Sequence, residues 1–292
     1  MIAPPEAHVT SREPDGVERR RVGDIDVLIR PGTSDACPLL LLHGIGSRSF
    51  SFQPLMQALG TARTVIAWDA PGYGASRPLA SPSPVVADYA VSALALLDAL
   101  ALPQVDLLGH SLGTLIAAHV AAHVAETTPQ RVRRLALLSP TLGYGVAPGA
   151  PLPPAVAARP VELAELGGDA FAGKRGPRLV HASERKPNAT QAVIAAMATM
   201  TLPGYAQAAH LLGTGRLLDD VAKLRCPTLV AVGAEDVVTP PDIARRVAQA
   251  LPPQAVTSAG AVLIEGCGHA VYLEEPATVA ALIERHFTGE RT

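Results

Sequence analysis

The chain has 292 residues, of which 48% are hydrophobic and 17% are charged, so it can bury a large core and is not disordered by composition. Its formal net charge of -2 shows no basic excess and argues against nucleic acid as a partner. The N-terminal part has no apolar run of signal-peptide length, and the apolar cluster at 39–42 is far too short to span a bilayer. We therefore expect a cytoplasmic protein that meets no membrane and acts on a small molecule.

Short apolar runs alternate with helical patterns along the chain. The opening segment, 19–32, predicts two antiparallel strands joined near Gly23 and Asp24. Continuous apolar runs, typical of strands covered on both faces, follow at 38–43, 64–69, 105–109, 134–139, 228–233 and 262–266. Between the second and third runs, apolar residues recur at steps of three and four and predict one helix face: Val86, Tyr89, Ala93, Leu97 and Leu100. This alternation predicts an α/β fold, with a mostly parallel central sheet flanked by helices.

The alternation breaks between about 140 and 215, where no buried-strand run appears. The first part is dense in proline and glycine, and a later part, 189–200, has a helical pattern. So long an interruption is rarely bare loop in a compact domain. We predict a helical cap, or lid, at 141–215, inserted into a core domain made of 1–140 and 216–292 and lying over the carboxyl edge of the sheet.

Ser111 lies between a predicted buried strand and a predicted helix, in the sequence Gly109-His110-Ser111-Leu112-Gly113. A residue at such a tight turn has a strained backbone, and its side chain is lifted clear of both elements. The flanking glycines relieve crowding there. The first amides of the following helix point to the space beside the serine and suit a developing negative charge. We interpret Ser111 as a nucleophile; the alternative is a structural turn in which the serine caps the helix.

The chain resembles the α/β-hydrolase family of serine hydrolases over most of its length. The stretch "HGIGS" at 43–47 is similar to the family's H-G-x-G oxyanion loop, and "DAPGYGAS" at 69–76 is similar to its D-x-x-G-x-G-x-S turn. The stretch "GHSLG" at 109–113 resembles its nucleophile elbow. The resemblance implies an α/β-hydrolase fold and a triad whose acid and histidine follow the serine in that order. It also implies an oxyanion hole made by the backbone amides of Ile45 and Leu112, and a reaction that needs no cofactor.

By this resemblance the acid of the triad lies just beyond the strand that follows the insertion. Here "PTLVAVG" at 227–233 runs into "AEDVVTP", so Asp236 fits best and Glu235 is the first substitute. An acid after the preceding strand is disfavoured, because "LALLSPTLG" offers Ser139 and Thr141 but no carboxylate. The alternative role of Asp236 is that of a helix-start residue near Pro240.

Nine histidines compete for the role of general base. His269 follows a short strand and two glycines in "GCGHAVYLEEP", at the sheet end where catalytic residues of such folds gather, and the family resemblance selects the same residue. His119 and His123 lie one helical turn apart, but no acidic residue accompanies them, so we predict a packed or solvated helix face and no metal. His43 and Gly44 of the oxyanion loop, with His110 of the elbow, are further candidates for contacts with the substrate.

A basic stretch, "GKRGPRLVHASERKP" at 173–187, falls within the predicted lid. Arg175, Arg178 or Arg185 could grip a substrate carboxylate with two parallel hydrogen bonds. That would suit a lactone acid or another product of aromatic-ring breakdown. The alternative is a solvated lid surface.

Two further stretches resemble 3-oxoadipate enol-lactonases and related carboxylesterases: "HGIGSRSF" at 43–50, and "GYAQAAHLL" at 204–212 with the segment 224–241 that follows. We therefore predict a serine hydrolase that cleaves a carboxylic ester or lactone of a small molecule through an acyl-enzyme. The alternatives on the same triad are cleavage of a carbon–carbon bond in a ring-fission diketone, amide hydrolysis and perhydrolysis. Haloalkane dehalogenation is disfavoured because a serine occupies the nucleophile position. A binding module without chemistry is disfavoured because all three triad positions hold competent residues.

Overall fold

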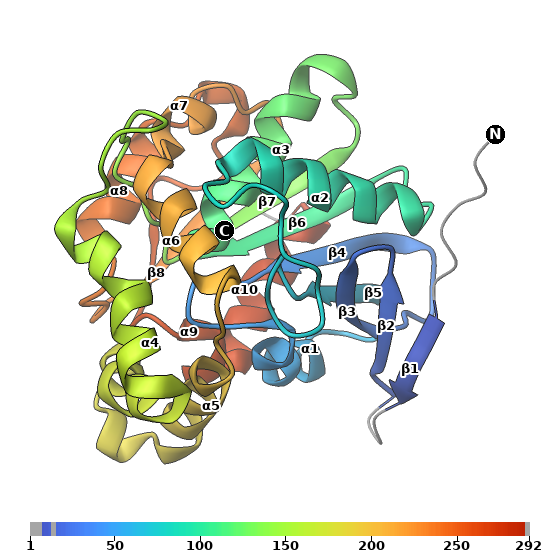
Figure 1. Ribbon diagram of the computed structural model, residues 1–292. Helices are drawn as coiled ribbons and strands as arrows, with labels where there is room; N and C mark the ends of the chain where they lie inside the picture. The colour runs from blue at the N-terminus through green and yellow to red at the C-terminus, as the bar shows by residue number, and fades with distance from the viewer. Residues whose placement is uncertain (1–7, 13–15, 290–292) are drawn as a thin grey trace.

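A computed structural model describes residues 8–12 and 16–289, and its strands form one sheet (Figure 1). The strands are β1 His8–Arg12, β2 Glu18–Val22, β3 Ile25–Arg30, β4 Ala36–Leu42, β5 Arg63–Trp68, β6 Val105–His110, β7 Val132–Leu138, β8 Thr228–Gly233 and β9 Val262–Ile264. Their order across the sheet is β1-β2-β3-β5-β4-β6-β7-β8-β9. Each apolar run singled out in the sequence is a strand of this sheet.

The first three strands pair antiparallel, β3 also pairs antiparallel with β5, and β5, β4, β6, β7, β8 and β9 are parallel neighbours. The predicted opening hairpin is therefore confirmed as β2 and β3. Strand β1 was not predicted, because an edge strand needs no continuous apolar run. In β4, by contrast, Leu39, Leu40, Leu41 and Leu42 are all 0% exposed, as a strand covered on both faces requires.

The helices cover both faces of the sheet (Figure 1). They are α1 Gln53–Ala58, α2 Val86–Ala99, α3 Leu112–Thr127, α4 Pro154–Arg175, α5 Pro187–Ala198, α6 Gly204–Thr214, α7 Leu217–Val221, α8 Pro241–Gln249, α9 Val271–Glu274 and α10 Pro276–Thr288. Helices α2 and α3 pack together on one face, and α1, α9 and α10 pack together on the other. The predicted fold class, a mostly parallel sheet flanked by helices, is confirmed.

The segment between β7 and β8 begins with irregular chain at 139–153 and is mainly helical from α4 to α7. It contains α4, which is kinked at Gly167, then α5 and α6, with short 3-10 turns η2 Gly176–Leu179 and η3 Ser183–Arg185 between α4 and α5. Helix α4 packs on α5 and α6, while α5 also contacts α9 and the 3-10 turn η1 Ser49–Phe52. The helices thus lie beside the carboxyl ends of the parallel strands. The domain boundaries at 141 and 215 stay a prediction.

Among the described helices, none combines the length and the apolar character needed to cross a bilayer.

Candidate active site

Ser111 is the single residue between the end of β6 and the start of α3. Its backbone has φ 52° and ψ -116°, a combination that L-residues rarely adopt. Its amide donates to the carbonyl oxygen of Leu138 on β7 at 3.0 Å, which fixes the turn against the neighbouring strand. The hydroxyl makes no capping hydrogen bond to α3. Ser111 occupies the cap position of α3, but its side chain does not cap the helix, and its role as the nucleophile stays a prediction.

The two glycines that flank Ser111 are required by close backbone contacts. A Cβ atom on Gly109 would lie 2.4 Å from the carbonyl oxygen of Gly113, and one on Gly113 would lie 2.1 Å from the carbonyl oxygen of Leu42. Side chains at either position would push α3 away from β4 and β6. The G-x-S-x-G spacing thus holds the start of α3 against the strands.

Asp236 and His269 are brought together by loops after the neighbouring strands β8 and β9. Oδ2 of Asp236 lies 2.8 Å from Nδ1 of His269, and both residues are buried. Oδ1 of Asp236 accepts the backbone amides of Val238 at 2.8 Å and Thr239 at 2.9 Å. The carboxylate therefore orders its own loop and faces the imidazole. It does not start α8, whose cap position is Pro240.

The carboxyl group of Asp236 has a pKa below its ordinary value. Burial on its own would raise the pKa, but the nearby His269 ring and the two donated backbone amides outweigh it. The group is consequently ionised at neutral pH and acts as an acceptor. His269 then carries its proton on Nδ1, which leaves the lone pair of Nε2 free.

Thr239 belongs to this group of contacts and was not predicted from the sequence. Its Oγ1 lies 2.9 Å from Oδ2 of Asp236, 3.2 Å from Nδ1 of His269 and 3.1 Å from the carbonyl oxygen of Ser139. The hydroxyl bridges the acid and the imidazole. The only signal in the sequence is a threonine three residues after the acid, which is common in loops.

His110 and Ser139 hold the backbone of His269. Nε2 of His110 lies 2.8 Å from the carbonyl oxygen of His269, and Oγ of Ser139 donates to the same oxygen at 3.2 Å. Because a carbonyl only accepts, Nε2 of His110 carries a hydrogen. Burial, followed by the neighbouring His269, lowers the pKa of His110 to about 3, so its ring is neutral. His110 also lines the cavity described below, as expected for a residue near the substrate.

A cavity of about 250 Å³ lies at Ser111. Its lining includes His269, Gly44, Ile45 and Leu112. The loop approaches the serine closely, since a Cβ atom on Gly44 would lie 3.0 Å from Cβ of Ser111. Within the described residues, no acceptor takes the backbone amide of Ile45 or that of Leu112. Both amides are thus available to an oxygen in the cavity.

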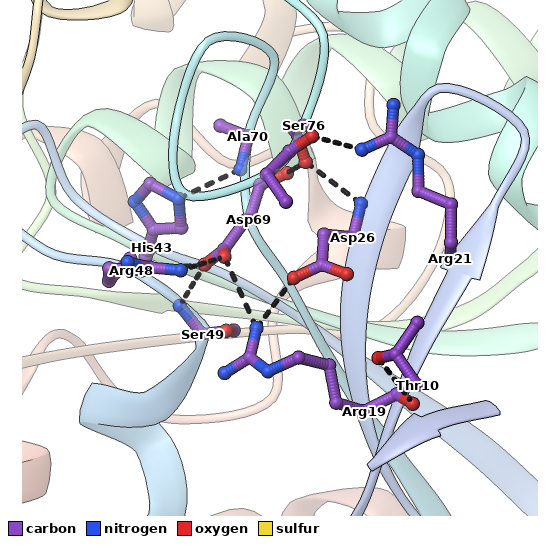
Figure 2. A network of polar contacts seen from close by, with 11 residues as sticks. Thr10, Arg19, Arg21, Asp26, His43, Arg48, Ser49, Asp69, Ala70 and Ser76 are labelled. Carbon is purple, nitrogen blue, oxygen red and sulfur yellow. Dashed lines mark hydrogen bonds and ion pairs between the residues drawn. The ribbon is translucent and has the colours of Figure 1, made fainter.

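His43 braces this loop from behind and does not line the cavity, which corrects its prediction as a substrate contact. Its Nε2 accepts the amide of Ala70 at 2.9 Å (Figure 2). Its Nδ1 lies 2.8 Å from the carbonyl oxygen of Gly44. Both ring nitrogens are therefore engaged. Burial is the main cause that lowers the pKa of His43 to about 4, so the ring is neutral. The hydroxyl of Tyr73 donates to the carbonyl oxygen of Ile45 at 2.8 Å and fixes the same loop.

The D-x-x-G-x-G-x-S turn is fastened to the oxyanion loop through Asp69 (Figure 2). This fully buried carboxylate accepts the amide of Ser49 at 2.7 Å and Nη2 of Arg48 at 2.6 Å. At the other end of the turn, Oγ of Ser76 donates to the carbonyl oxygen of Asp69 at 2.6 Å and accepts the amide of Asp26 at 2.8 Å. The motif is thus a scaffold for the loop that contains Ile45.

Arginines of the segment between β7 and β8 reach the cavity, but not all those predicted. Arg175 and Arg178 line it, whereas the side chain of Arg185 is 84% exposed and lies outside the lining, so its prediction as a substrate contact is wrong. Arg159 also lines the cavity and was not predicted. It stands apart from the basic stretch at 173–187, and only a lone arginine in an alanine-rich helix could have indicated it.

His119 and His123 lie outside the lining of the cavity at Ser111. Nδ1 of His119 lies 3.0 Å from Oδ2 of Asp220, at the end of the neighbouring helix α7, and His123 is exposed. No cluster of three or more histidine, cysteine or acidic side chains suited to a metal occurs in the described part of the chain.

This chain is similar in sequence and in fold to known proteins. A sequence model of the Alpha/beta hydrolase family matches residues 39–282. The (E)-2-((N-methylformamido)methylene)succinate hydrolase of Acinetobacter baylyi is 28% identical over 203 residues, which are 68% of this chain and 72% of that protein. Two solved structures share the fold, each with a TM-score of 0.77 and 23% identity. One is a thermophilic esterase from Thermogutta terrifontis with malate bound (98% of this chain, 100% of that one), and the other is an enol-lactonase from Burkholderia xenovorans LB400 (92% and 99%).

Proposed function

The chain belongs to the α/β-hydrolase family of hydrolases, and from this premise we propose that it is a serine hydrolase that cleaves a carboxylic ester or lactone of a small molecule. The observation that carries the proposal is one cavity lined by Ser111, His269 and the residues with free amides, Ile45 and Leu112. Oδ2 of Asp236 lies next to Nδ1 of His269, the ring nitrogen on the other side from Nε2. A second cavity, whose described lining includes Asp24, Arg77 and Ser92, contains no histidine that could act as a base.

The first half of the reaction forms an acyl-enzyme. His269 takes the proton of the Ser111 hydroxyl on Nε2, since Nδ1 already carries a hydrogen that faces Asp236. Oγ of Ser111 attacks the carbonyl carbon of the substrate. The negative charge on the carbonyl oxygen is stabilised by the amides of Ile45 and Leu112, and one such donor contributes roughly 2.7–4 kcal/mol.

The imidazolium of His269 gives its proton to the leaving alcohol or enol oxygen, whose departure completes the acyl-enzyme, while Asp236 stabilises the charged ring. The second half of the reaction releases the acid. A water molecule, deprotonated by the same nitrogen, then attacks the acyl carbon and frees Ser111. The Val238 and Thr239 amides hold the Asp236 carboxylate in place throughout the cycle.

A second candidate is hydrolysis of a nitrogen-bearing substrate on the same residues. It is favoured by the relative from Acinetobacter baylyi, which is named as a hydrolase of an N-methylformamido-methylene succinate. Carbon–carbon cleavage and perhydrolysis would also use this triad, but no contact in the cavity favours them.

A covalent probe and a substrate panel test the proposal. A phosphonofluoridate should attach to the peptide that contains Ser111, and Ser111→Ala should abolish both the attachment and turnover. The panel pairs aryl esters and enol-lactones with N-formyl enamides and ring-fission diketones. Turnover of the first two classes supports the ester and lactone proposal. Labelling of another serine, or undiminished turnover by Ser111→Ala, would remove the serine mechanism.

A further inference from the structure

We propose that the substrate carries a free carboxylate, and that Arg159 and Arg178 hold this group in the cavity while its ester or lactone carbonyl faces Ser111. The inference rests on the proposed function and adds the substrate class to it. It would make the substrate a short half-ester of a dicarboxylic acid, or a lactone that bears an acid group.

The charge of the cavity wall is the first observation. Among the described residues that line the cavity there are three arginines and neither an aspartate nor a glutamate. The chain as a whole has 26 acidic residues against 24 lysines and arginines, so this wall departs from the average charge of the protein. A cleft lined by charge of one sign concentrates small molecules of the opposite sign.

Arg175 is already paired with a carboxylate and forms a fixed part of the wall. Its Nε donates to Oε2 of Glu162 at 2.7 Å, and its Nη2 contacts the same oxygen. The guanidinium also lies over the ring of Phe171, 5.1 Å from the centroid. Glu162 is held further by Lys174. Arg175 therefore has an anionic partner without a substrate.

Arg159 and Arg178 differ from Arg175, because neither has an ion-pair partner in the residues that the structure describes. Arg159 is half-buried, whereas Arg178 is exposed, and the guanidinium of Arg159 lies next to the hydroxyl of Tyr205. Burial raises the pKa of Tyr205, and the charge of Arg159 opposes that rise. For Arg159, half-burial without a counter-ion costs free energy, and a bound carboxylate would offset this cost. Arg178 lines the same cavity and would add a second charged hydrogen-bond donor to that carboxylate.

The size and lining of the cavity limit the length of the carbon chain that joins the carboxylate of the substrate to its ester or lactone carbonyl. About 250 Å³ is less than the roughly 300–1,000 Å³ of pockets that take drug-sized ligands. Between the polar groups, the wall is apolar: Leu179, Val193, Met197 and Leu212. A few methylene groups fit this description, and a long acyl chain does not.

The test compares two substrates that differ only in charge, the 4-nitrophenyl half-ester of glutaric acid and the same compound with its free acid methylated. We expect the protein to favour the half-ester in kcat/KM by about 100-fold or more. Arg159→Gln and Arg178→Gln should each reduce this preference about 10- to 100-fold, the range expected for a lost charged hydrogen-bond pair. Arg185→Gln is the matched control: its side chain lies outside the cavity, so the preference should not change.

A binding measurement gives a readout that does not require turnover. In the Ser111→Ala background, glutarate should bind by calorimetry, and adding Arg159→Gln or Arg178→Gln should weaken binding at least tenfold. Adding Arg185→Gln should have no effect. Melting temperatures verify that each variant is folded, and Arg178→Lys, which keeps the charge without the planar fork, should retain part of the affinity.

The outcomes separate the inference from the proposed function. If the methylated ester is cleaved as well as the half-ester and glutarate does not bind, the carboxylate site is overturned and the serine mechanism stands. If glutarate binds through these arginines but neither ester is cleaved, the site stands and the proposed ester chemistry fails. Equal losses in Arg185→Gln and Arg178→Gln would overturn the assignment of the site to the cavity.

Discussion

Nδ1 of His269 lies 2.8 Å from Oδ2 of Asp236, a residue 33 positions earlier in the chain. They meet because β8 and β9 are parallel neighbours and each residue follows its own strand at the same edge of the sheet. The carboxylate accepts from Nδ1, so Nε2 is the nitrogen left to act as a base. The fold thereby fixes the tautomer before any substrate arrives.

Replacing Asp236 by Asn should lower kcat by about 10⁴-fold, the effect known for this change in another serine-hydrolase triad. An asparagine can still accept the amides of Val238 and Thr239 through its oxygen, so the loop should stay intact. Its NH2 group would then face Nδ1 of His269 and favour the tautomer with its proton on Nε2. Steady-state kinetics on an aryl ester, with circular dichroism to verify folding, measure this effect.

Glu235→Gln is the matched control, one residue away. The backbone of Glu235 donates to the carbonyl oxygen of Cys267 at 3.0 Å, a bond that the substitution keeps, and its carboxylate makes no contact with the imidazole among the described interactions. We expect less than a fewfold change in kcat. The opposite ranking of the two variants would assign the acid to Glu235.

The strained backbone at Ser111 predicts an unusual order of stability. With φ 52° and ψ -116°, Ser111→Gly should have a higher free energy of unfolding than Ser111→Ala, by about 1–2 kcal/mol. Elsewhere glycine is the less stable choice by roughly 0.5–1 kcal/mol, because it loses more conformational freedom on folding. Urea denaturation of the two inactive variants measures the difference.

Ser92, inside helix α2, provides the control for this comparison. There the ordinary order should hold, with Ser92→Gly less stable than Ser92→Ala by about 1 kcal/mol. If Ser111→Gly were also the less stable variant, the turn would not be strained in solution.

Features that depend on residues close together in the sequence could be predicted, and these features include the buried strands and the turn at Ser111 that define the fold. Buried parallel strands leave continuous apolar runs, and β4 is such a run from Leu39 to Leu42. The crowded turn at Ser111 requires glycines at fixed spacing, because β6 and α3 meet at one residue. Strand β1 leaves no comparable pattern, since it pairs on one side only.

The predictions that failed depend on where a side chain points after the chain has folded. His43 is in the oxyanion motif, but its ring is held by the amide of Ala70, 27 residues later, and faces away from the cavity. Arg178 and Arg185 are both exposed and belong to the same basic stretch, but the chain turns between them at Ala182, which has φ 47°, and only Arg178 lines the cavity. Neither side-chain orientation can be predicted from the residues that neighbour it in the sequence.

Glu274 should be a positioning residue that joins the His269 loop to the segment after η2. Its buried carboxylate accepts the amide of Gly268 at 2.9 Å, the amide of His181 at 3.0 Å and Nζ of Lys186 at 3.2 Å. Glu274→Gln keeps the shape but replaces one acceptor oxygen by an NH2 group. We expect the free energy of unfolding to fall by about 1–3 kcal/mol and kcat to fall more than KM changes.

Glu275→Gln tests whether this effect is specific, because the neighbouring side chain is exposed. That change should shift the free energy of unfolding by no more than about 0.5 kcal/mol and leave kcat unchanged. An equally mild effect of Glu274→Gln would show that the contacts with Gly268 and His181 do not position the histidine loop.

Three buried neutral histidines predict a loss of stability in mild acid. Burial is the main cause that lowers the pKa of His43 to about 4, that of His110 to about 3 and that of His286 to about 4. Because each folded pKa lies below the unfolded value of about 6.5, the unfolded chain binds more protons between these values. The stabilisation is therefore complete above pH 6.5 and is lost as the pH falls. Three such groups give a slope of roughly 3–4 kcal/mol per pH unit between pH 6 and pH 5.

Urea denaturation at several pH values measures this slope. Single histidine variants show how much of the slope each ring contributes. His286 can be replaced without touching the active site, since its Nε2 lies 3.0 Å from the carbonyl oxygen of Leu135 and a glutamine amide can donate there instead. His286→Gln should remove about a third of the slope, because it removes one of the three groups that take up a proton on unfolding. His123→Gln, at an exposed position on α3, should leave the slope as it is. A flat profile between pH 6 and pH 5 in the unmodified protein would mean that these rings are already charged in the folded state, and then the hydrogen bond from Ala70 to Nε2 of His43 could not exist.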